Sequence, residues 1–249
     1  MGAARPRRRA APSVLSAAAA APPPRRVYGR RRGRKLRPGQ QALRETLLPE
    51  LRVALPTEGT LDPRGLFAPP VEAVWLEVGF GGGEHLATQA AAHPAIGLLG
   101  AEVFENGVVK LLGEVKRRGL ANVRLFIDDA RLLIAALPEA SLARAFILFP
   151  DPWPKLRHHK RRIVSRETLD RLAFALADGA ELRLATDDPD YLDWMLERAT
   201  AHPAFEWQAR RPADWRERPA DWPPTRYEQK ALAAGRRPWF LRFRRRPRG

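Results

Sequence analysis

The sequence predicts an α/β fold, in which a mostly parallel sheet carries helices on both faces. Short apolar segments alternate with helical patterns of roughly 10–15 residues from residue 74 onward, as in consecutive βαβ units. A glycine cluster at 79–83 follows the first of these segments, where a strand should turn into a helix. The last two strand-like segments, 205–210 and 239–244, have no helix-length pattern between them. We therefore expect them to pair antiparallel, which gives a seven-stranded sheet with an antiparallel C-terminal strand.

Each expected element has a local pattern behind it. A first helix is expected over 40–54, where Leu43, Leu47, Leu48 and Leu51 recur at helical spacing. Gly119 stands where a helix that begins at 105 should end, because glycine favours the left-handed conformation of a helix C-terminus. The five parallel strands are expected at 74–80, 98–103, 123–128, 144–150 and 181–186, and their helices at 84–92, 105–118, 130–136, 165–177 and 188–201.

The segment between the last two strands contains a short direct repeat. Arg-Pro-Ala-Asp-Trp occurs at 211–215 and again at 218–222. Two copies are too few for a repeat architecture, so we interpret them as a local duplication in an irregular loop. A functional alternative is that Trp215 or Trp222 stacks on a nucleic-acid base.

Composition limits the chemistry and suggests a partner. The chain has 249 residues, no cysteine and a formal net charge of +16. The lack of cysteine excludes disulfides, thiolate zinc sites, iron–sulfur clusters and a cysteine nucleophile. Residues 1–37 carry 12 basic and no acidic side chains, whereas the rest of the chain has 32 basic against 28 acidic ones. The excess positive charge indicates a polyanionic partner, most commonly nucleic acid.

The basic N-terminal part divides the chain into three regions. Residues 1–26 are an Ala/Pro/Arg-rich tail that we expect to be disordered, and 27–54 form a basic arm and the first helix, ahead of one large domain at 55–249. The Ala-rich start also resembles a signal peptide loosely, but its prolines interrupt it. No segment approaches the length of a membrane helix, so we expect a cytoplasmic protein with no membrane partner.

The glycine turn is the strongest local indication of a ligand. Its pattern is an acid followed by three alternate glycines, Glu77, Gly79, Gly81 and Gly83. A dinucleotide-binding fingerprint would need glycine at position 84, where Glu84 stands instead. A glutamate in the first helical turn opposes a phosphate but suits a ligand without one, such as S-adenosylmethionine (AdoMet). A glycine turn that binds nothing is the plain alternative.

Acidic residues follow or end each parallel strand. They are Glu77, Glu102, Asp129, Asp151 and Asp187. Because ligands of such sheets bind beyond the carboxyl ends of the strands, we expect a row of five carboxylates there. Glu102 would accept hydrogen bonds from ribose hydroxyls, and Asp129 lies where an adenine amino group could be read. Asp128, Asp187 and Asp188 also precede helices, so each could simply be a helix cap.

Three motifs resemble one known family. They are Phe149-Pro-Asp-Pro-Trp-Pro-Lys155 with the basic run to Arg162, then Ala185-Thr-Asp187, then Thr225-Arg-Tyr-Glu228. All occur in the order found in the bacterial TrmB-type tRNA (guanine-N7)-methyltransferases, and the resemblance covers roughly residues 27–245. It implies a class I AdoMet-dependent methyltransferase (Rossmann-like) fold for residues 55–249. It also implies transfer of a methyl group to N7 of a guanine in the tRNA variable loop, which forms 7-methylguanosine.

The same resemblance implies site residues. The family's AdoMet contacts fall on Glu77, Glu102, Asp129 and Asp151, with Gly79, Gly81 and Gly83 forming the turn. Its substrate contacts fall on Lys155, Asp187, Thr225, Arg226, Tyr227 and Glu228. The sequence departs from the family at Arg226, where Lys is common, and at Tyr227, where Phe is common.

The chemistry of N7 methylation fits the same residues. Guanine N7 has a free lone pair and no proton, so no general base is needed, and positioning and electrostatics can supply the catalysis. We expect Asp151 to be the catalytic carboxylate that stabilises the positive charge of the methylated ring. Trp153 could stack on the guanine or pack beneath the loop.

The basic run after the fourth strand is expected to contact RNA phosphates through Arg157, Lys160, Arg161 and Arg162. The alternative is a solvated charge run. His158 and His159 have no further ligands in the sequence pattern, so no metal is expected. The arm and the Arg-rich stretch 236–248 should add phosphate contacts.

Other functions remain open from the residues alone. A non-catalytic RNA-binding protein on the same fold would explain the charge, and a methyltransferase of another nucleic acid or of a protein would explain the pocket. An NAD-dependent oxidoreductase is disfavoured by Glu84 and by the lack of a hydride-transfer constellation. Monomer and homodimer are both compatible with the sequence.

Overall fold

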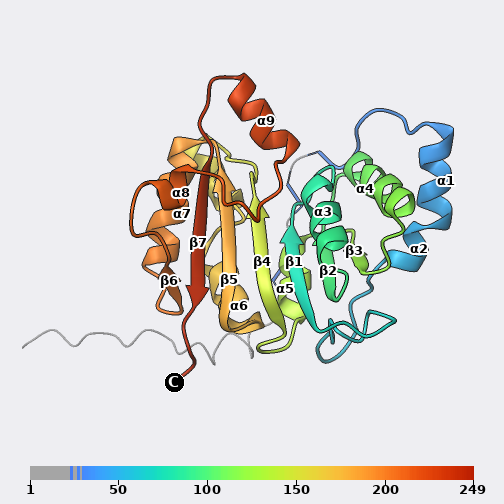
Figure 1. Cartoon of the computed structure of the whole chain (residues 1–249), viewed down its shortest axis with the longest axis horizontal. Helices are drawn as coiled ribbons and strands as arrows, with labels where there is room; N and C mark the ends of the chain where they lie inside the picture. The colour runs from blue at the N-terminus through green and yellow to red at the C-terminus, as the bar shows by residue number, and fades with distance from the viewer. Residues whose placement is uncertain (1–22, 25–26, 29) are drawn as a thin grey trace, which may run out of the picture.

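The computed structural model describes residues 23–24, 27–28 and 30–249 (Figure 1). The expected disordered tail 1–26 therefore lies almost wholly outside the described residues. Two short helices, α1 (Pro38–Thr46) and α2 (Leu48–Leu51), precede the sheet. The strands are β1 (Ala73–Val78), β2 (Ile96–Ala101), β3 (Val123–Phe126), β4 (Leu142–Leu148), β5 (Leu176–Thr186), β6 (Phe205–Trp207) and β7 (Trp239–Arg245). The helices after β1 are α3 (Glu84–Ala92), α4 (Glu105–Arg118), α5 (Ala130–Ala136), α6 (Arg166–Ala175), α7 (Pro189–Thr200), α8 (Ala213–Arg216) and α9 (Arg226–Ala233), with a 3₁₀ helix, η2, at Leu156–Arg161.

The seven strands form one sheet in the order β3-β2-β1-β4-β5-β7-β6. The first five are parallel, whereas β7 pairs antiparallel with both β5 and β6. The predicted fold class is confirmed, including the antiparallel C-terminal strand. Because the order reverses direction at β1 and β4, the carboxyl ends of these two strands mark the switch point where such sheets bind ligands.

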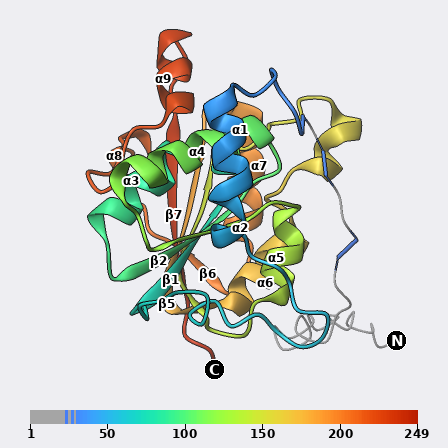
Figure 2. The ribbon, with the colours of Figure 1, turned by 90° about the vertical axis from the view of Figure 1, so that its right-hand side faces the viewer.

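Two apolar cores lie on opposite faces of the sheet. Alternate residues of β1 separate them: Val74, Leu76 and Val78 belong to the core beneath α5, α6 and α7, whereas Trp75 belongs to the core beneath α3 and α4. Figure 2 shows the sheet nearly edge-on, with α3 and α4 on one side and α5 and α6 on the other. The same alternation places the side chain of Glu77 on the α3 face, which matters for the site below.

The predicted helix 40–54 is divided into α1 and α2 at Leu47. Pro49 lies in the first turn of α2, and proline cannot continue a helix because it lacks an N–H and its ring clashes with the preceding turn. After α2 the chain pairs with the edge of the sheet, where Val53 N donates to Leu125 O at 2.8 Å. The helix pair is thereby held against α4 and β3.

The segment between β6 and β7 is more ordered than the sequence predicted, because it contains α8 and α9. The repeat does not present its second tryptophan to solvent: Trp222 is buried, and its ring packs edge-on against Phe240 at 5.4 Å between centroids. The base-stacking alternative is therefore wrong for Trp222. In the part of the chain that the structure describes, no helix is long and apolar enough to cross a membrane.

Candidate active site at the carboxyl edge of the sheet

The turn after β1 has the backbone that its glycines allow. Gly79, Gly81 and Gly83 have φ angles of 72°, 55° and 76°, which residues other than glycine rarely adopt. The glycines differ in what they face. A Cβ at Gly83 would lie 2.6 Å from Leu111 Cβ, so this glycine lets α3 pack on α4, whereas a Cβ at Gly81 would lie 2.9 Å from the ring of Tyr227. Gly79 and Gly81 line the cavity described next, and Gly83 does not.

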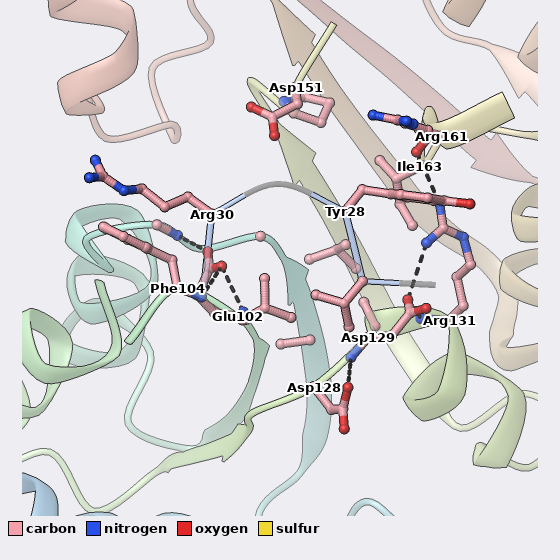
Figure 3. A pocket seen from close by; sticks show the side chains of 18 of the residues that line it. Tyr28, Arg30, Glu102, Phe104, Asp128, Asp129, Arg131, Asp151, Arg161 and Ile163 are labelled. Atoms are coloured by element: carbon pink, nitrogen blue, oxygen red, sulfur yellow. Dashed lines mark hydrogen bonds and ion pairs between the residues drawn. The ribbon is translucent and has the colours of Figure 1, made fainter. Parts of the chain in front are cut away.

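A cavity of about 360 Å³ opens at the ends of β1, β2, β3 and β4 (Figure 3). Its volume falls within the range of small-molecule sites. The segments that follow these four strands line the cavity, and α9 contributes one residue. The basic arm crosses the cavity from outside. The lining includes Val27, Tyr28, Arg30, Gly79, Gly81, Glu102, Phe104, Asp128, Asp129, Arg131, Phe149, Asp151, Trp153, Arg161 and Tyr227.

Glu102 is held rigidly at one wall of the cavity. One carboxylate oxygen accepts from Gly81 N at 2.7 Å, and the other accepts from Val103 N at 2.7 Å and Phe104 N at 2.9 Å. Burial raises the pKa of Glu102 above its ordinary value, although these three backbone donors oppose the rise. A carboxylate has about four lone-pair sites, so Glu102 can still accept hydrogen bonds from a ligand.

Asp129 stands at the opposite wall, and its carboxylate contacts both the backbone and the side chain of Arg131. Its carboxylate caps α5 by accepting from Arg131 N at 3.1 Å, and it also contacts the Arg131 guanidinium at 3.2 Å. The side chain of Asp128 accepts from Asp129 N at 2.7 Å. The helix-cap alternative is thus correct for Asp188 and wrong for Asp128 and Asp187, because Asp129 is the cap of α5 and Asp188 the cap of α7. Capping does not remove Asp129 from the site, because the residue also lines the cavity.

Asp151 lies at the mouth of the cavity in an unusual loop. The loop begins at Phe149 and reaches Trp153, and both residues have positive φ angles, 51° and 46°. Such backbone strain in residues other than glycine gathers at functional sites. Among the described residues Asp151 has no hydrogen-bond or ion-pair partner, and partial burial raises its pKa. Its charge is therefore available to a ligand in the cavity.

Two of the five expected carboxylates do not join this row. Glu77 is buried and its carboxylate contacts His85 Nδ1 at 2.7 Å, because its position in β1 turns it towards α3 instead of the cavity. Asp187 does not line the cavity, and it pairs with Arg236 at 2.7 Å. The structure brings Glu102, Asp129 and Asp151 together, with Asp128 beside them, so the expected row of five is corrected to this smaller set.

The run 225–228 forms the beginning of α9. Thr225 is its N-cap and accepts from Glu228 N at 3.1 Å, while the Glu228 carboxylate pairs with Arg218 at 3.1 Å. Both side chains are buried. Arg226 is exposed, and Tyr227 reaches the cavity with 40% of its surface accessible. Burial raises the pKa of Tyr227, with smaller contributions from the nearby Glu102 and Asp151 charges.

The basic run after β4 divides into two groups. Lys155, Arg157 and Lys160 are exposed, and Arg161 lines the cavity, where its guanidinium lies 4.8 Å from the ring of Trp153. Arg162 is different because its side chain is buried. It donates to Pro152 O at 2.7 Å, pairs with Asp190 and lies between the rings of Tyr191 and Trp194. The expectation that Arg162 contacts RNA phosphates is therefore corrected, since it anchors the loop from inside.

The cavity residues that the sequence reasoning missed include Arg131, Tyr28 and Arg30. Arg131 is turned inward by Asp129, a contact that no sequence pattern specified. Tyr28 and Arg30 belong to the basic arm, and Figure 3 shows them across the cavity between Asp151 and Glu102. Tyr28 packs against Trp153 at 6.2 Å between ring centroids. An aromatic residue within a basic segment is a signal that could have assigned it to a nucleic-acid-binding surface.

The arm is fixed to the beginning of α4 by two consecutive residues. Glu105 N donates to Arg31 O at 2.9 Å, and Asn106 accepts from Gly33 N at 2.6 Å and donates to Arg34 O at 2.8 Å. Within the described part of the chain, no group of three or more His, Asp or Glu side chains is arranged to hold a metal ion.

Comparison with known proteins shows the family of the chain. A family model described as "Putative methyltransferase" matches residues 71–241. A tRNA (guanine-N(7)-)-methyltransferase of Rhodospirillum rubrum is 57% identical over 226 residues, which cover 90% of this chain and 89% of that protein. A protein of the same name from Paramagnetospirillum magneticum is 55% identical, with coverage of 90% and 94%. Among solved structures, the 16S rRNA methyltransferase KamB has a TM-score of 0.53 and 17% identity over 71% of this chain and 89% of its own, a likeness of fold.

Proposed function

The chain belongs to the tRNA (guanine-N7)-methyltransferase family, and from this we propose that it transfers a methyl group from AdoMet to N7 of a guanine in the variable loop of tRNA. The product would be 7-methylguanosine. The proposal accounts for the site and the basic surface, and it requires no general base because the N7 lone pair is free.

One observation carries the assignment of the donor site. Glu102, Asp129 and Asp151 surround the cavity of about 360 Å³ at the switch point of the sheet. Glu102 is preorganised by three backbone N–H donors, and its remaining lone pair can accept from a hydroxyl of the ribose. Asp129 would read the adenine, and Gly79 and Gly81 would let the methionine part approach the backbone. No phosphate-binding feature is required, since AdoMet has no phosphate.

The reaction needs orientation more than proton transfer. The N7 lone pair forms a bond to the methyl carbon while the bond from that carbon to the sulfonium sulfur breaks, and the sulfur keeps the electron pair. S-adenosylhomocysteine leaves as a neutral thioether, and the positive charge passes to the guanine ring. Asp151, which has no ion-pair partner among the described residues, would stabilise that charge and accept from the N1 or N2 hydrogens of the guanine.

The surrounding residues would place the tRNA. Arg161 and Trp153 lie at the cavity mouth, and Lys155, Arg157 and Lys160 extend the positive charge outward. Tyr227 and Arg226 would contact the substrate from α9, while Thr225 and Glu228 hold that helix in position. Asp187, paired with Arg236 outside the cavity, is proposed to contact the tRNA beyond the target nucleotide.

The test is a methyl-transfer assay. Purified protein is incubated with tritiated-methyl AdoMet and unmodified tRNA transcript, and the tRNA is digested for nucleoside analysis. We expect label in 7-methylguanosine, and none when the target guanine is replaced by adenine. Binding of AdoMet without transfer to tRNA would instead indicate a non-catalytic RNA-binding protein. Label in another nucleoside would show a different acceptor.

A further inference from the structure

A second cavity lies beside the first, between the arm, the helix pair and α4. Its volume is about 500 Å³. Its floor is apolar and consists of Leu48, Val103, Val108, Val109 and Ile127. Val108 and Val109 are buried in α4, and the other three are half-buried. We refer to this cavity as the arm groove.

The rim of the arm groove carries an excess of positive charge. Four arginines from three segments surround it, Arg31 and Arg32 from the arm, Arg44 from α1 and Arg52 from the end of α2, and the one acidic lining residue is Glu105. Arg44 lies 3.1 Å and Arg32 3.8 Å from the Glu105 carboxylate, so one carboxylate is shared by two guanidinium groups. All four arginines are exposed, which leaves their remaining donors accessible to a ligand.

The position of the arm groove relates it to the methyl-transfer site. Val103 lines both cavities, because it follows Glu102 at the end of β2. Ile127 follows β3, so the floor of the groove lies at the same carboxyl edge of the sheet as the AdoMet cavity. The arm bridges the two cavities, since Arg30 lines the first and Arg31 the second. Figure 2 shows the arm leaving α1 and running toward the loop that contains η2.

We propose that the arm groove binds a nucleotide of the tRNA substrate, with its base on the apolar floor and the flanking phosphates on Arg31, Arg32, Arg44 and Arg52. An apolar floor beneath guanidinium groups is the chemistry that single-stranded nucleic acid requires, because bases are flat and apolar on their faces whereas the backbone is anionic. An acidic peptide would match the rim but leave the floor without a partner, and a second copy of this chain would bring more positive charge to it.

This inference rests on the proposed function, since a tRNA whose guanine enters the first cavity must continue along the same edge of the protein. Together with Lys155, Arg157 and Arg161 on the far side, the groove would extend the RNA contact to both sides of the target nucleotide. The tRNA would then be held at two points, and the guanine between them would be presented to AdoMet.

The experiment measures tRNA binding in the absence of AdoMet, so that it does not depend on methyl transfer. Arg44→Ala, Arg52→Ala and the double variant are compared with Arg64→Ala, an exposed arginine in the loop before β1 that lines neither cavity. Counterion release predicts a rise in Kd of about fivefold for each lost phosphate contact near 0.15 M salt. We expect about that rise for each single variant, about 25-fold for the double variant, and a shallower dependence of log Kd on log salt.

A floor variant separates base contact from general electrostatics. Leu48→Gln keeps the charge of the groove and should raise the Kd for tRNA severalfold without changing the salt dependence. AdoMet affinity by calorimetry should stay at the wild-type value in all variants, since none of these residues lines the first cavity. Leu48 packs against the core beneath α3 and α4, so Leu48→Gln is compared with the wild type below its own melting temperature.

Two outcomes would overturn the inference. One is a tRNA Kd within twofold of wild type for the double variant, or an equal loss for Arg64→Ala. The other is a change in molar mass by light scattering without a change in tRNA affinity, which would make the groove an interface between copies of the chain. If the wild type formed 7-methylguanosine while the double variant bound tRNA normally, this result would reject the arm groove as a tRNA contact and leave the proposed function standing.

Discussion

The carboxyl edge of the sheet and the basic segments around it differ in where their charged side chains point. At the edge, the Glu102 and Asp151 carboxylates face a cavity, and burial raises the pKa of each. In the basic segments, some arginines turn inward and find partners. Arg162 is buried against Asp190, and Arg245 is buried and donates to Ala173 O. Arg183 of β5 is buried in the same way, against Glu181 and Asp221.

The difference shows which charges are kept for a ligand. A carboxylate left near a cavity without a cation lowers the stability of the free protein, so its position is explained by a positively charged ligand. An arginine buried between aromatic rings and a carboxylate is explained by packing alone. The number of basic residues therefore overstates the surface available to RNA, whereas the few cavity carboxylates mark the proposed reaction site.

The largest expected effect comes from Asp151→Asn. The change keeps the size of the side chain and removes the charge proposed to stabilise the methylated guanine. We expect kcat to fall by about 100-fold or more, roughly 2.7 kcal/mol in transition-state free energy. Single-turnover methylation of tRNA with saturating AdoMet is the measurement. A rate within threefold of wild type would reject the role of Asp151. Asp188→Asn serves as the control for loss of a carboxylate outside the cavity, because Asp188 caps α7 and does not line the cavity.

Two arginines of the basic run after β4 should differ in their effects, because one is buried and the other is exposed. Arg162→Ala removes a hydrogen bond to Pro152 O and the packing between Tyr191 and Trp194, so we expect a loss of about 2–3 kcal/mol in unfolding free energy. Asp190 is exposed enough to be hydrated afterwards, which limits the cost. Arg157→Ala should leave the melting temperature unchanged and raise the tRNA Kd about fivefold near 0.15 M salt.

The measurements are thermal unfolding and tRNA binding on both variants. If Arg162→Ala melted like the wild type and lost only tRNA affinity, the division between interior and surface arginines would be wrong.

Glu102→Gln tests the preorganised wall of the cavity. One oxygen that accepts backbone N–H groups becomes an NH₂ group, which cannot accept, so either Gly81 N or the pair Val103 N and Phe104 N loses its partner. We expect AdoMet affinity to fall by at least about tenfold, or 1.4 kcal/mol, since hydrogen bonds to a charged group are worth about 1.5–3 kcal/mol. Calorimetric titration with AdoMet measures this. Unchanged affinity would exclude Glu102 from the cofactor site.

The sequence predicted the edge better than the periphery, for a physical reason. The carboxyl ends of parallel strands share one edge of the sheet, so the alternation of strands and helices placed Glu102, Asp129 and Asp151 there correctly. The same rule was wrong for Asp187, because β5 lies one strand beyond the switch point between β1 and β4. Glu77 was misplaced because the acid precedes the end of β1, and the twofold alternation of a strand turns its side chain to the α3 face.

No comparable rule predicts whether the side chain of an arginine in a loop points to solvent or into the protein. Whether Arg162 faces solvent or Asp190 depends on tertiary contacts that no spacing encodes. By contrast, α9 could have been found, because Thr225 followed by Glu228 three residues later is the pattern of a capping box at a helix start.

Thr225 should contribute to the site through helix α9. Its hydroxyl accepts from Glu228 N, so Thr225→Ala is expected to cost about 1 kcal/mol in stability, and Thr225→Ser about none. Because Tyr227 lies in the next turn and reaches the cavity, we expect the KM for tRNA to rise in Thr225→Ala and to recover in Thr225→Ser. Steady-state kinetics with both variants checks this. An equal loss of activity in the serine variant would indicate a role for the threonine methyl group instead of the cap.

The smallest effect returns to Asp151, through stability instead of rate. Burial raises the pKa of Asp151, so the folded protein holds this proton more tightly than the unfolded chain does. The contribution of Asp151 to the free energy of unfolding therefore falls as pH rises from the ordinary carboxyl pKa through the raised value. At neutral pH Asp151→Asn should melt at the wild-type temperature or slightly above it. Below the ordinary carboxyl pKa the difference should vanish, because both side chains are then neutral.

Melting curves of the two proteins without ligand, measured across this pH range, test the point. A variant that melted clearly lower than wild type at neutral pH would mean that Asp151 is held by a favourable partner in the free protein. The contrast between the two regions would then fail, because this carboxylate would be satisfied by the fold and not kept for a cation.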